Sequence, residues 1–137
     1  MEHHIESAVT FWRGFLADKG DELAVYIENM VDDDPSLLAA LCDRVADDRF
    51  RLCLDVGHAH CNSSTPVAVW IAMLAGRIGH VHLHNNDGQR DSHWPLCRGT
   101  LDMGAALQQL QSEAPDATYT LECDFAPSLE WLLNRQA

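Results

Sequence analysis

Four short β-rich segments alternate with stretches of helical periodicity, and this alternation constrains the fold more than any other feature of the chain. The β-rich segments span residues 23–29, 50–58, 78–85 and 118–124. Five further stretches carry apolar side chains at the spacing of one helix face: residues 5–18, 35–46, 67–76, 103–113 and 127–136. Strands that alternate with helices of ten or more residues form parallel sheets with right-handed crossovers. The sequence therefore predicts one α/β domain over residues 1–137, with four parallel strands and five helices.

A charged or imidazole side chain stands at the C-terminal end of every β-rich segment. The positions are Glu28, Asp55, His82 with His84, and Glu122. Strands of a parallel sheet are usually buried on both faces and therefore consist of continuous apolar runs. Carboxylates gathered at one edge of such a sheet would repel each other and would lose hydration. Because a divalent cation removes both costs, the pattern predicts a metal site at this edge.

Residues 78–85, IGHVHLHN, predict two different faces for the third strand. Successive side chains of a strand point to opposite faces. His80, His82 and His84 should therefore share one face, while Val81 and Leu83 pack against helices on the other. In the other three strands the same rule groups small or polar side chains with the terminal carboxylate. This is the arrangement of a barrel wall whose functional groups line the C-terminal rim.

Charge, hydropathy and cysteine content exclude several classes of protein. A net charge of −12 disfavours nucleic acid as a partner, because the chain would be repelled by a phosphate backbone. No apolar run approaches the roughly 20 residues that span a bilayer, and the first residues do not form a signal peptide. The five cysteines are scattered and contain no CxxC pair, so we expect neither a disulfide framework nor a thiolate zinc site. We expect a reduced, cytoplasmic protein.

The motifs IEN, LDVGH, HVHLHNNDGQRDSH and LEC, in this order, resemble the second half of the xylose isomerase-like TIM barrels, also called AP endonuclease family 2. That superfamily includes sugar and sugar-phosphate isomerases and epimerases, and the endonuclease IV group. The resemblance implies that Glu28, Asp55, His82 and Glu122 hold one divalent metal ion, with His84 as the alternative to His82. Carboxylates with one imidazole suit zinc or manganese, with magnesium and cobalt as further candidates.

The resemblance also implies a function, with two alternatives left open. It implies an isomerase or epimerase that converts a sugar or sugar phosphate through an enediolate, with Glu28 and Glu122 moving the proton. The alternatives are an endonuclease IV-like zinc phosphodiesterase and a non-catalytic metal-binding half-barrel. Arg98 replaces the glutamate of the common LGEG motif and argues against a nuclease. Three more residues match positions that contact substrate or bind an additional zinc in the superfamily: His58, Asp91 and His93.

The chain is too short for a complete barrel. A (β/α)8 barrel has eight strands in about 250 residues, and this chain provides four. Half a barrel leaves two open sheet edges, which pair readily with other strands. We therefore expect two chains to associate edge to edge as a homodimer that closes the ring. Two copies would bring ten outer helices to the eight helix positions of a barrel. The alternatives are therefore a different polypeptide that supplies the missing half, or a gene remnant that folds but no longer turns over substrate.

Overall fold

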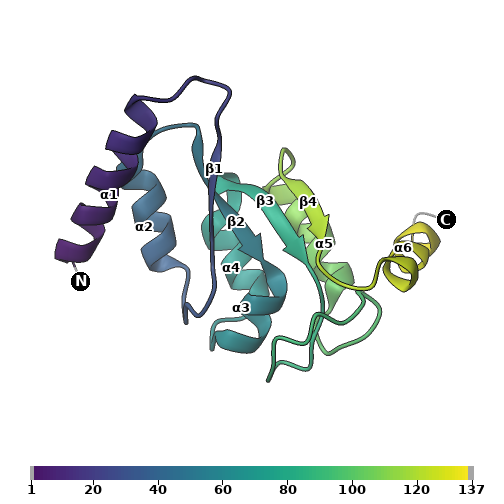
Figure 1. Cartoon of the computed structure of the whole chain (residues 1–137). Helices are drawn as coiled ribbons and strands as arrows, with labels where there is room; N and C mark the ends of the chain where they lie inside the picture. The colour runs from purple at the N-terminus through teal and green to yellow at the C-terminus, as the bar shows by residue number, and fades with distance from the viewer. Residues whose placement is uncertain (1, 136–137) are drawn as a thin grey trace.

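Four strands form one parallel sheet in the computed structural model, which describes residues 2–135. The strands lie in the order β1-β2-β3-β4, and each pairs in parallel with the next (Figure 1). All four C-terminal ends therefore meet at the same edge of the sheet, and the predicted parallel α/β architecture is confirmed. The strands are β1 (Val25–Glu28), β2 (Phe50–Asp55), β3 (Ile78–Leu83) and β4 (Thr118–Leu121).

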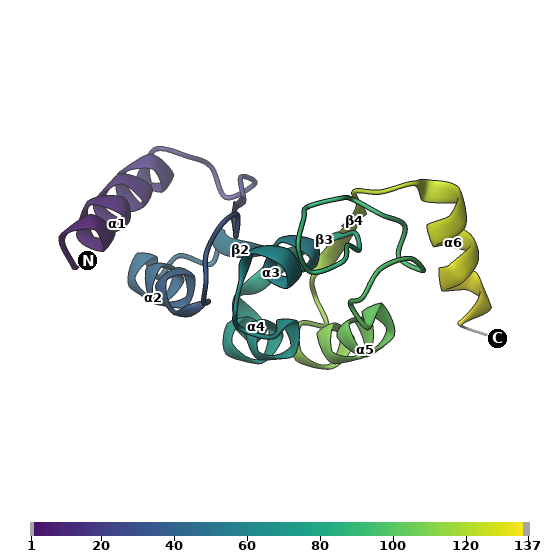
Figure 2. The same ribbon diagram turned by 90° about the horizontal axis from the view of Figure 1, so that it is seen from below.

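Five of the helices lie in an arc around one side of the sheet (Figure 2). They are α1 (Glu2–Ala17), α2 (Ser36–Val45), α4 (Val67–Leu74), α5 (Met103–Glu113) and α6 (Phe125–Asn134). A 3₁₀ turn, η1 (Ala75–Arg77), leads from α4 into β3. The opposite side of the sheet, here called the open face, carries no helix among the described residues (Figure 1). Among residues 2–135, none of the helices combines the length and the hydropathy that a membrane-spanning segment needs.

A sixth helix, α3 (Val56–Asn62), corrects the predicted count of five. The sequence predicts that the second strand continues through residue 58, but β2 ends at Asp55. The Asp55 carboxylate accepts a hydrogen bond of 2.7 Å from the His58 backbone N–H and so caps α3. An aspartate at this position satisfies a free N–H of the first helical turn, so the chain turns directly from strand into helix.

The other three strands also end earlier than predicted, and β1 ends at Glu28, one residue before its predicted end. β3 ends at Leu83 and β4 at Leu121, so that His84 and Glu122 lie one residue beyond their strands. Alternation of side chains therefore no longer governs the direction of either residue. The last predicted helix extends to residue 136, which lies outside the described residues.

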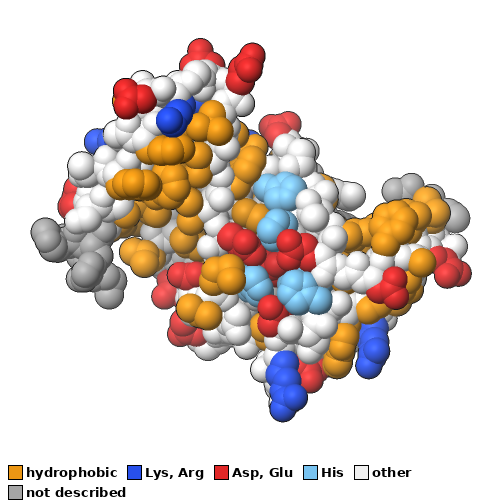
Figure 3. Space-filling model, in the orientation of Figure 1, with side chains coloured by type: hydrophobic (Ala, Val, Ile, Leu, Met, Phe, Trp, Pro, Cys, Tyr) orange, Lys and Arg blue, Asp and Glu red, His pale blue; other side chains and the backbone are white. Residues whose placement is uncertain are grey.

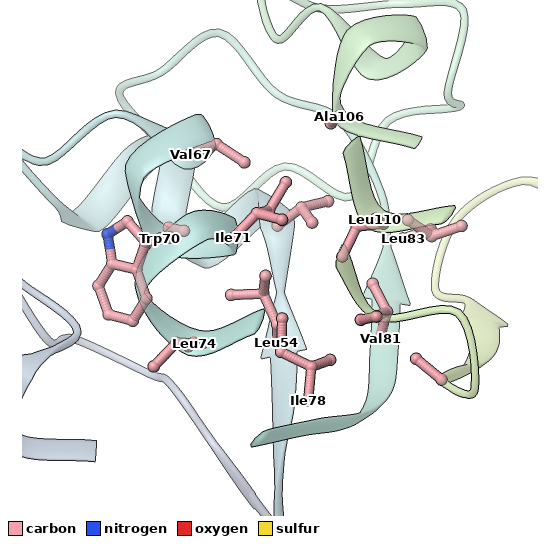
Figure 4. Packing of buried hydrophobic residues seen from close by; sticks show 14 of the residues in the cluster. Leu54, Val67, Trp70, Ile71, Leu74, Ile78, Val81, Leu83, Ala106 and Leu110 are labelled. Carbon is pink, nitrogen blue, oxygen red and sulfur yellow. The ribbon is translucent and has the colours of Figure 1, made fainter. Parts of the chain in front are cut away.

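The main core lies between the sheet and the helices α4 and α5. Leu54 of β2 and Val81 of β3 are fully buried against Trp70, Ile71 and Leu110 from these two helices (Figure 4). Burial of each such side chain stabilises the fold by about 1.5–3 kcal/mol relative to exposure. The apolar half of each strand therefore holds the sheet against its helices, and the polar half is left for the open face.

A smaller core attaches α1 to the outer side of β1 and β2. Ile5, Val9 and Leu16 of α1 are buried together with Val45 and Phe50. β1 and β4 are the two outermost strands, and neither pairs with another strand within residues 2–135. The sheet is therefore an open half-ring with an unpaired strand at each edge.

Candidate metal centre

His82 lies at the centre of the four residues that the sequence predicts as metal ligands. Its Nδ1 is 3.2 Å from Glu122 Oε1, 3.3 Å from Glu28 Oε1 and 3.8 Å from Asp55 Oδ2. Ligand atoms of Glu28, Asp55 and His82 all lie within 4.8 Å of one another, and Glu122 approaches His82 from the end of β4. Three carboxylates from three strand ends thus surround one imidazole nitrogen.

A second group of possible ligands adjoins the first. Asp91 Oδ2 is 3.2 Å from His58 Nε2 and 3.2 Å from His93 Nε2. His84 Nε2 is 3.6 Å from Asp91 Oδ1, and these four residues offer ligand atoms within 4.8 Å of one another. His58, Asp91 and His93, which the sequence predicts to bind a second metal or the substrate, therefore lie close together, and His84 lies beside them.

The position of His84 differs from the predicted one. Alternation along the strand places it beside His82, whereas its ring is fully buried and stacks on the His93 ring at a centroid distance of 3.9 Å. Its Nε2 donates to the Asp55 carboxylate, at 2.9 Å from Oδ1. Its Nδ1 is buried without a hydrogen-bond partner among the described residues. In space, His84 belongs to the second group more than to the first.

The hydrogen bonds of His58 and His93 determine which ring nitrogen can bind a metal. His58 Nδ1 donates to the Asn29 carbonyl at 2.9 Å, and His93 Nδ1 donates to the Glu122 carbonyl at 2.7 Å. Because a carbonyl only accepts, both Nδ1 atoms carry a proton, and both Nε2 lone pairs face Asp91 in the neutral rings. A backbone carbonyl behind the ring is the usual support of a metal-binding histidine.

Asp55 connects the two groups. Its side chain is fully buried and accepts hydrogen bonds from the His58 N–H and from His84 Nε2. Burial alone would raise the pKa of Asp55, but these hydrogen bonds and the neighbouring imidazoles outweigh burial and hold the pKa below its usual value. Asp55 is therefore an ionised carboxylate in the interior, which requires a nearby positive charge.

The histidines of the second group respond to the same excess of negative charge. Burial lowers the pKa of His58, but the Asp55 carboxylate, the Asn29 carbonyl and Asp91 outweigh burial and raise it above the ordinary value. Burial also lowers the pKa of His93, and the Glu122 carbonyl together with Asp91 raises it overall. The raised pKa values show that negative charge surrounds both rings, and a metal ion bound there would compete with protons for the ring nitrogens.

Three buried asparagines support both groups, and sequence reasoning missed all of them. The Asn29 side chain joins the ends of β1 and β2, since it donates to the Asp55 carbonyl at 3.0 Å and accepts from the Asp55 N–H at 2.8 Å. Asn85 donates to the Leu96 and Leu101 carbonyls, and Asn86 donates to the Gly57 carbonyl. The signal was present in IEN, where Asn29 directly follows β1, and in HNND, where Asn85 and Asn86 lie within three residues of the end of β3.

A third group lies on the open face, further from the rim. Ligand atoms of Cys53, His80 and His82 are within 4.8 Å of one another. Both ring nitrogens of His80 already contact threonine hydroxyls, at 2.6 Å and 3.0 Å. Burial and the adjacent carboxylates raise the pKa of the Cys53 thiol to about 12. This group therefore contains a protonated thiol and an imidazole whose nitrogens are already hydrogen-bonded, and it is less suited to a cation than the rim residues.

The open face has an acidic and histidine-rich centre between two apolar areas (Figure 3). Glu28, Glu122, Asp91 and His93 are partly exposed there, whereas Asp55 and His84 are fully buried. The helices cover the other side of the sheet (Figure 2).

Comparisons with known proteins agree with this geometry. The model of the family described as xylose isomerase-like TIM barrel matches residues 9–134. A search of curated proteins gives no match. Among solved structures, a D-tagatose 3-epimerase-like protein is similar with a TM-score of 0.72 and 20% identity, over 95% of this chain and 51% of that chain.

Two further solved structures are similar. The TTHB071 protein from Thermus thermophilus, soaked with ZnCl2, has a TM-score of 0.66 and 27% identity, over 95% of this chain and 55% of that chain. The 3-keto-D-glucoside 4-epimerase YcjR from E. coli, in its apo form, has a TM-score of 0.68 and 17% identity, over 92% and 51%. The chain spans about half the length of these proteins. It therefore belongs to the xylose isomerase-like TIM barrel family, of which it forms a half-barrel.

Proposed function

We propose that this half-barrel carries the metal site of a divalent-metal-dependent isomerase or epimerase that acts on a sugar or sugar phosphate. The observation that supports this most is the approach of three carboxylates to His82 Nδ1, at 3.2–3.8 Å. Oxygen ligands with one imidazole suit zinc or manganese, and magnesium or cobalt as alternatives. The family, and the names of two similar structures as sugar epimerases, agree with this substrate class.

The proposed ligands are Glu28, Asp55, His82 and Glu122. They fit a cation because their side chains face one another across a few ångströms, and every ion pair that these four residues form with the described part of the chain involves histidine and no lysine or arginine. A bound divalent cation supplies a Lewis acid that polarises a carbonyl and its neighbouring hydroxyl. Asp55 is fully buried and holds its position through hydrogen bonds, so it serves as a ligand only.

Glu28 and Glu122 are the proposed acid and base. They approach His82 from the ends of the two outermost strands, β1 and β4, and both are partly exposed. One carboxylate removes a proton from the carbon beside the substrate carbonyl, which gives an enediolate, and the other returns a proton to the neighbouring carbon or to the opposite face. His58, Asp91 and His93 would then contact the substrate hydroxyls or hold a second ion.

The test combines metal content, oligomeric mass and activity on one sample. We expect one ion per chain, and Glu122→Gln should abolish isomerase activity while circular dichroism and thermal unfolding stay unchanged. Glu130→Gln is the matched control, because it removes an exposed carboxylate on α6 away from the rim. Wild-type turnover in Glu122→Gln would remove this residue from the proposed role.

A zinc phosphodiesterase is the second candidate, and one observation favours it. The Nε2 atoms of His58 and His93 both face the same Asp91 oxygen, which suits an additional ion. This candidate requires two or more ions per chain and salt-dependent binding to duplex DNA. One ion per chain and no binding to duplex DNA would exclude the phosphodiesterase. If the complete assembly binds no metal, only the non-catalytic half-barrel remains.

We also propose that a second subunit closes the barrel, because both edge strands are unpaired within the described residues. A homodimer is the assembly predicted from the sequence. Its mass in solution would be twice the 15.3 kDa of the chain. All five cysteines are free thiols, in keeping with the predicted reducing cytoplasm, which stays a prediction.

A further inference from the structure

The two carboxylate oxygens of Asp55 have different surroundings. Oδ1 accepts from the His58 backbone N–H at 2.7 Å and lies 2.9 Å from His84 Nε2. Oδ2 lies slightly further from the same His84 nitrogen, at 3.1 Å, and faces His82 Nδ1 at 3.8 Å. A carboxylate oxygen has two lone pairs, and two N–H groups already occupy those of Oδ1. Oδ2 is therefore the oxygen of Asp55 that remains available to a metal ion.

His84 has no ring nitrogen free to bind an ion. Because the ionised Asp55 carboxylate only accepts, the Nε2 that faces it must carry the proton. Nδ1 is then the unprotonated nitrogen, and it is buried without a hydrogen-bond partner among the described residues. A Cβ at Gly57 would lie 2.3 Å from Nδ1, so the backbone of α3 closes off this side of the ring.

Packing holds the His84 ring in the orientation that directs Nε2 to Asp55. The ring is fully buried and lies almost parallel to the His93 ring, at an interplanar angle of 11°. Three of its atoms would lie within 2.5 Å of a Cβ at Gly57, which shows how closely the helix backbone approaches. Protein interiors are close-packed, so a ring enclosed in this way cannot turn unless its neighbours move. Gly57 and His93 thus keep the donor in place.

We infer that His84 is a positioning residue of the metal centre and not one of its ligands. Its N–H holds the Asp55 carboxylate so that Oδ1 stays occupied and Oδ2 is offered to the ion beside His82. The sequence leaves His84 as the alternative to His82, and this geometry assigns the ligand role to His82. The inference rests on the proposed function, since it gives His84 a role within the same site. Loss of a hydrogen bond that orients a ligand typically weakens metal binding about 10- to 100-fold.

Two variants of His84 separate its hydrogen bond from its packing. His84→Phe keeps an aromatic ring against His93 but removes the N–H. His84→Gln removes the ring but keeps an N–H donor, because the amide nitrogen is as many bonds from Cβ as Nε2 is. A positioning role predicts that the Gln variant binds metal nearly as well as wild type, and that the Phe variant binds about 10- to 100-fold more weakly. A purely structural role predicts the opposite order.

The affinity of the full chain for zinc measures this difference without any assay of activity. Competition with a chromophoric chelator gives the affinity, and thermal unfolding of each variant is recorded beside it. His60→Phe is the matched control, because His60 is an imidazole on α3 that contacts the Thr100 hydroxyl at 2.8 Å and belongs to neither rim group. It should bind zinc as wild type does. Wild-type affinity in His84→Phe, or a larger loss in His84→Gln than in His84→Phe, would overturn the inference.

A measurement on the wild-type chain needs no variant that folds. In ¹⁵N-labelled protein loaded with ¹¹³Cd, scalar coupling to cadmium identifies the ring nitrogens that bind the ion. We expect coupling to a nitrogen of His82 and none to His84, whose Nε2 should stay protonated. Coupling to His84 would overturn the inference and leave the metal site intact. A wild-type chain that binds neither zinc nor cadmium would instead refute the proposed function, and the role of His84 would fall with it.

Discussion

Replacement of Gly57 by alanine should destabilise the protein through His84. Gly57 lies in the first turn of α3, and an ideal Cβ there would be 2.0 Å from His84 Cε1 and 2.3 Å from Nδ1. Real Cβ atoms essentially never come within 3.0 Å of a heavy atom to which they are not linked along the chain. The ring cannot move aside freely, because it is fully buried and stacks on His93 at 3.9 Å. Alanine must therefore displace either the ring or the helix.

The expected cost follows from the contacts that are lost. Displacement of the ring breaks the 2.9 Å hydrogen bond from His84 Nε2 to Asp55, and a hydrogen bond to a charged group contributes about 1.5–3 kcal/mol. Overpacking costs about 1–3 kcal/mol more, and the helix propensity of alanine returns about 1 kcal/mol. We expect a net loss of about 1.5–5 kcal/mol, which lowers the urea midpoint by about 0.8–2.5 M at an m-value of about 2 kcal/mol/M.

Urea unfolding followed by circular dichroism measures this loss, with two comparisons. Gly14→Ala in α1 is the matched control, because no atom lies within 4 Å of its Cβ, and it should stabilise the protein by about 0.5–1 kcal/mol. In the double variant Gly57→Ala/His84→Ala the ring is gone, so the added methyl group should cost nothing further. A Gly57→Ala midpoint at or above wild type, or an equal loss with and without His84, would refute the steric explanation.

Three further predictions concern the acid response, the loop and the metal. Hydrogen bonds from Arg49 hold the pKa of Asp47 at about 2, below the ordinary 3.8, so the pair adds stability that is complete above about pH 4 and lost as pH falls through 2. Asp47→Asn should therefore unfold at lower urea than wild type at pH 7 and converge with it near pH 2; a constant difference would contradict this. Asn86→Ala removes a buried donor to the Gly57 carbonyl and an acceptor for the Gly88 N–H, and should cost about 1–3 kcal/mol and speed proteolysis within residues 87–100. Unchanged cleavage would show that Asn86 does not hold the loop. Zinc or manganese at a hundredfold excess over Kd should stabilise the assembled protein by about 2.7 kcal/mol, and Asp55→Asn, unlike Asp47→Asn, should abolish this response.

The convergence of the first rim group could be predicted from sequence because it depends on regular structure. Parallel strands bring their C-terminal ends to one edge, so Glu28, Asp55, His82 and Glu122 had to approach each other once four strands were recognised. Pairing of Asp55 with His82 in the register of β2 and β3 makes this direct. Local periodicity and strand order were sufficient for this part of the site.

The second group depends on contacts that no local pattern contains. His84 lies beyond the end of β3, where period-two alternation stops, and its position is determined by Asp55, 29 residues earlier in the chain. His58 meets Asp91 across 33 residues, and it does so from a helix that the sequence analysis treated as strand. These positions required the loop of residues 84–102 to fold back onto α3, which Asn86 secures.

By itself, the sequence determined the half-barrel and the edge at which its acidic residues meet, because side-chain alternation and parallel pairing are properties of neighbouring residues and of strand order. Only the tertiary structure decided that His84 joins His58, Asp91 and His93. The physical reason is that irregular segments take their conformation from whatever buries and hydrogen-bonds them, and those partners are distant in the chain.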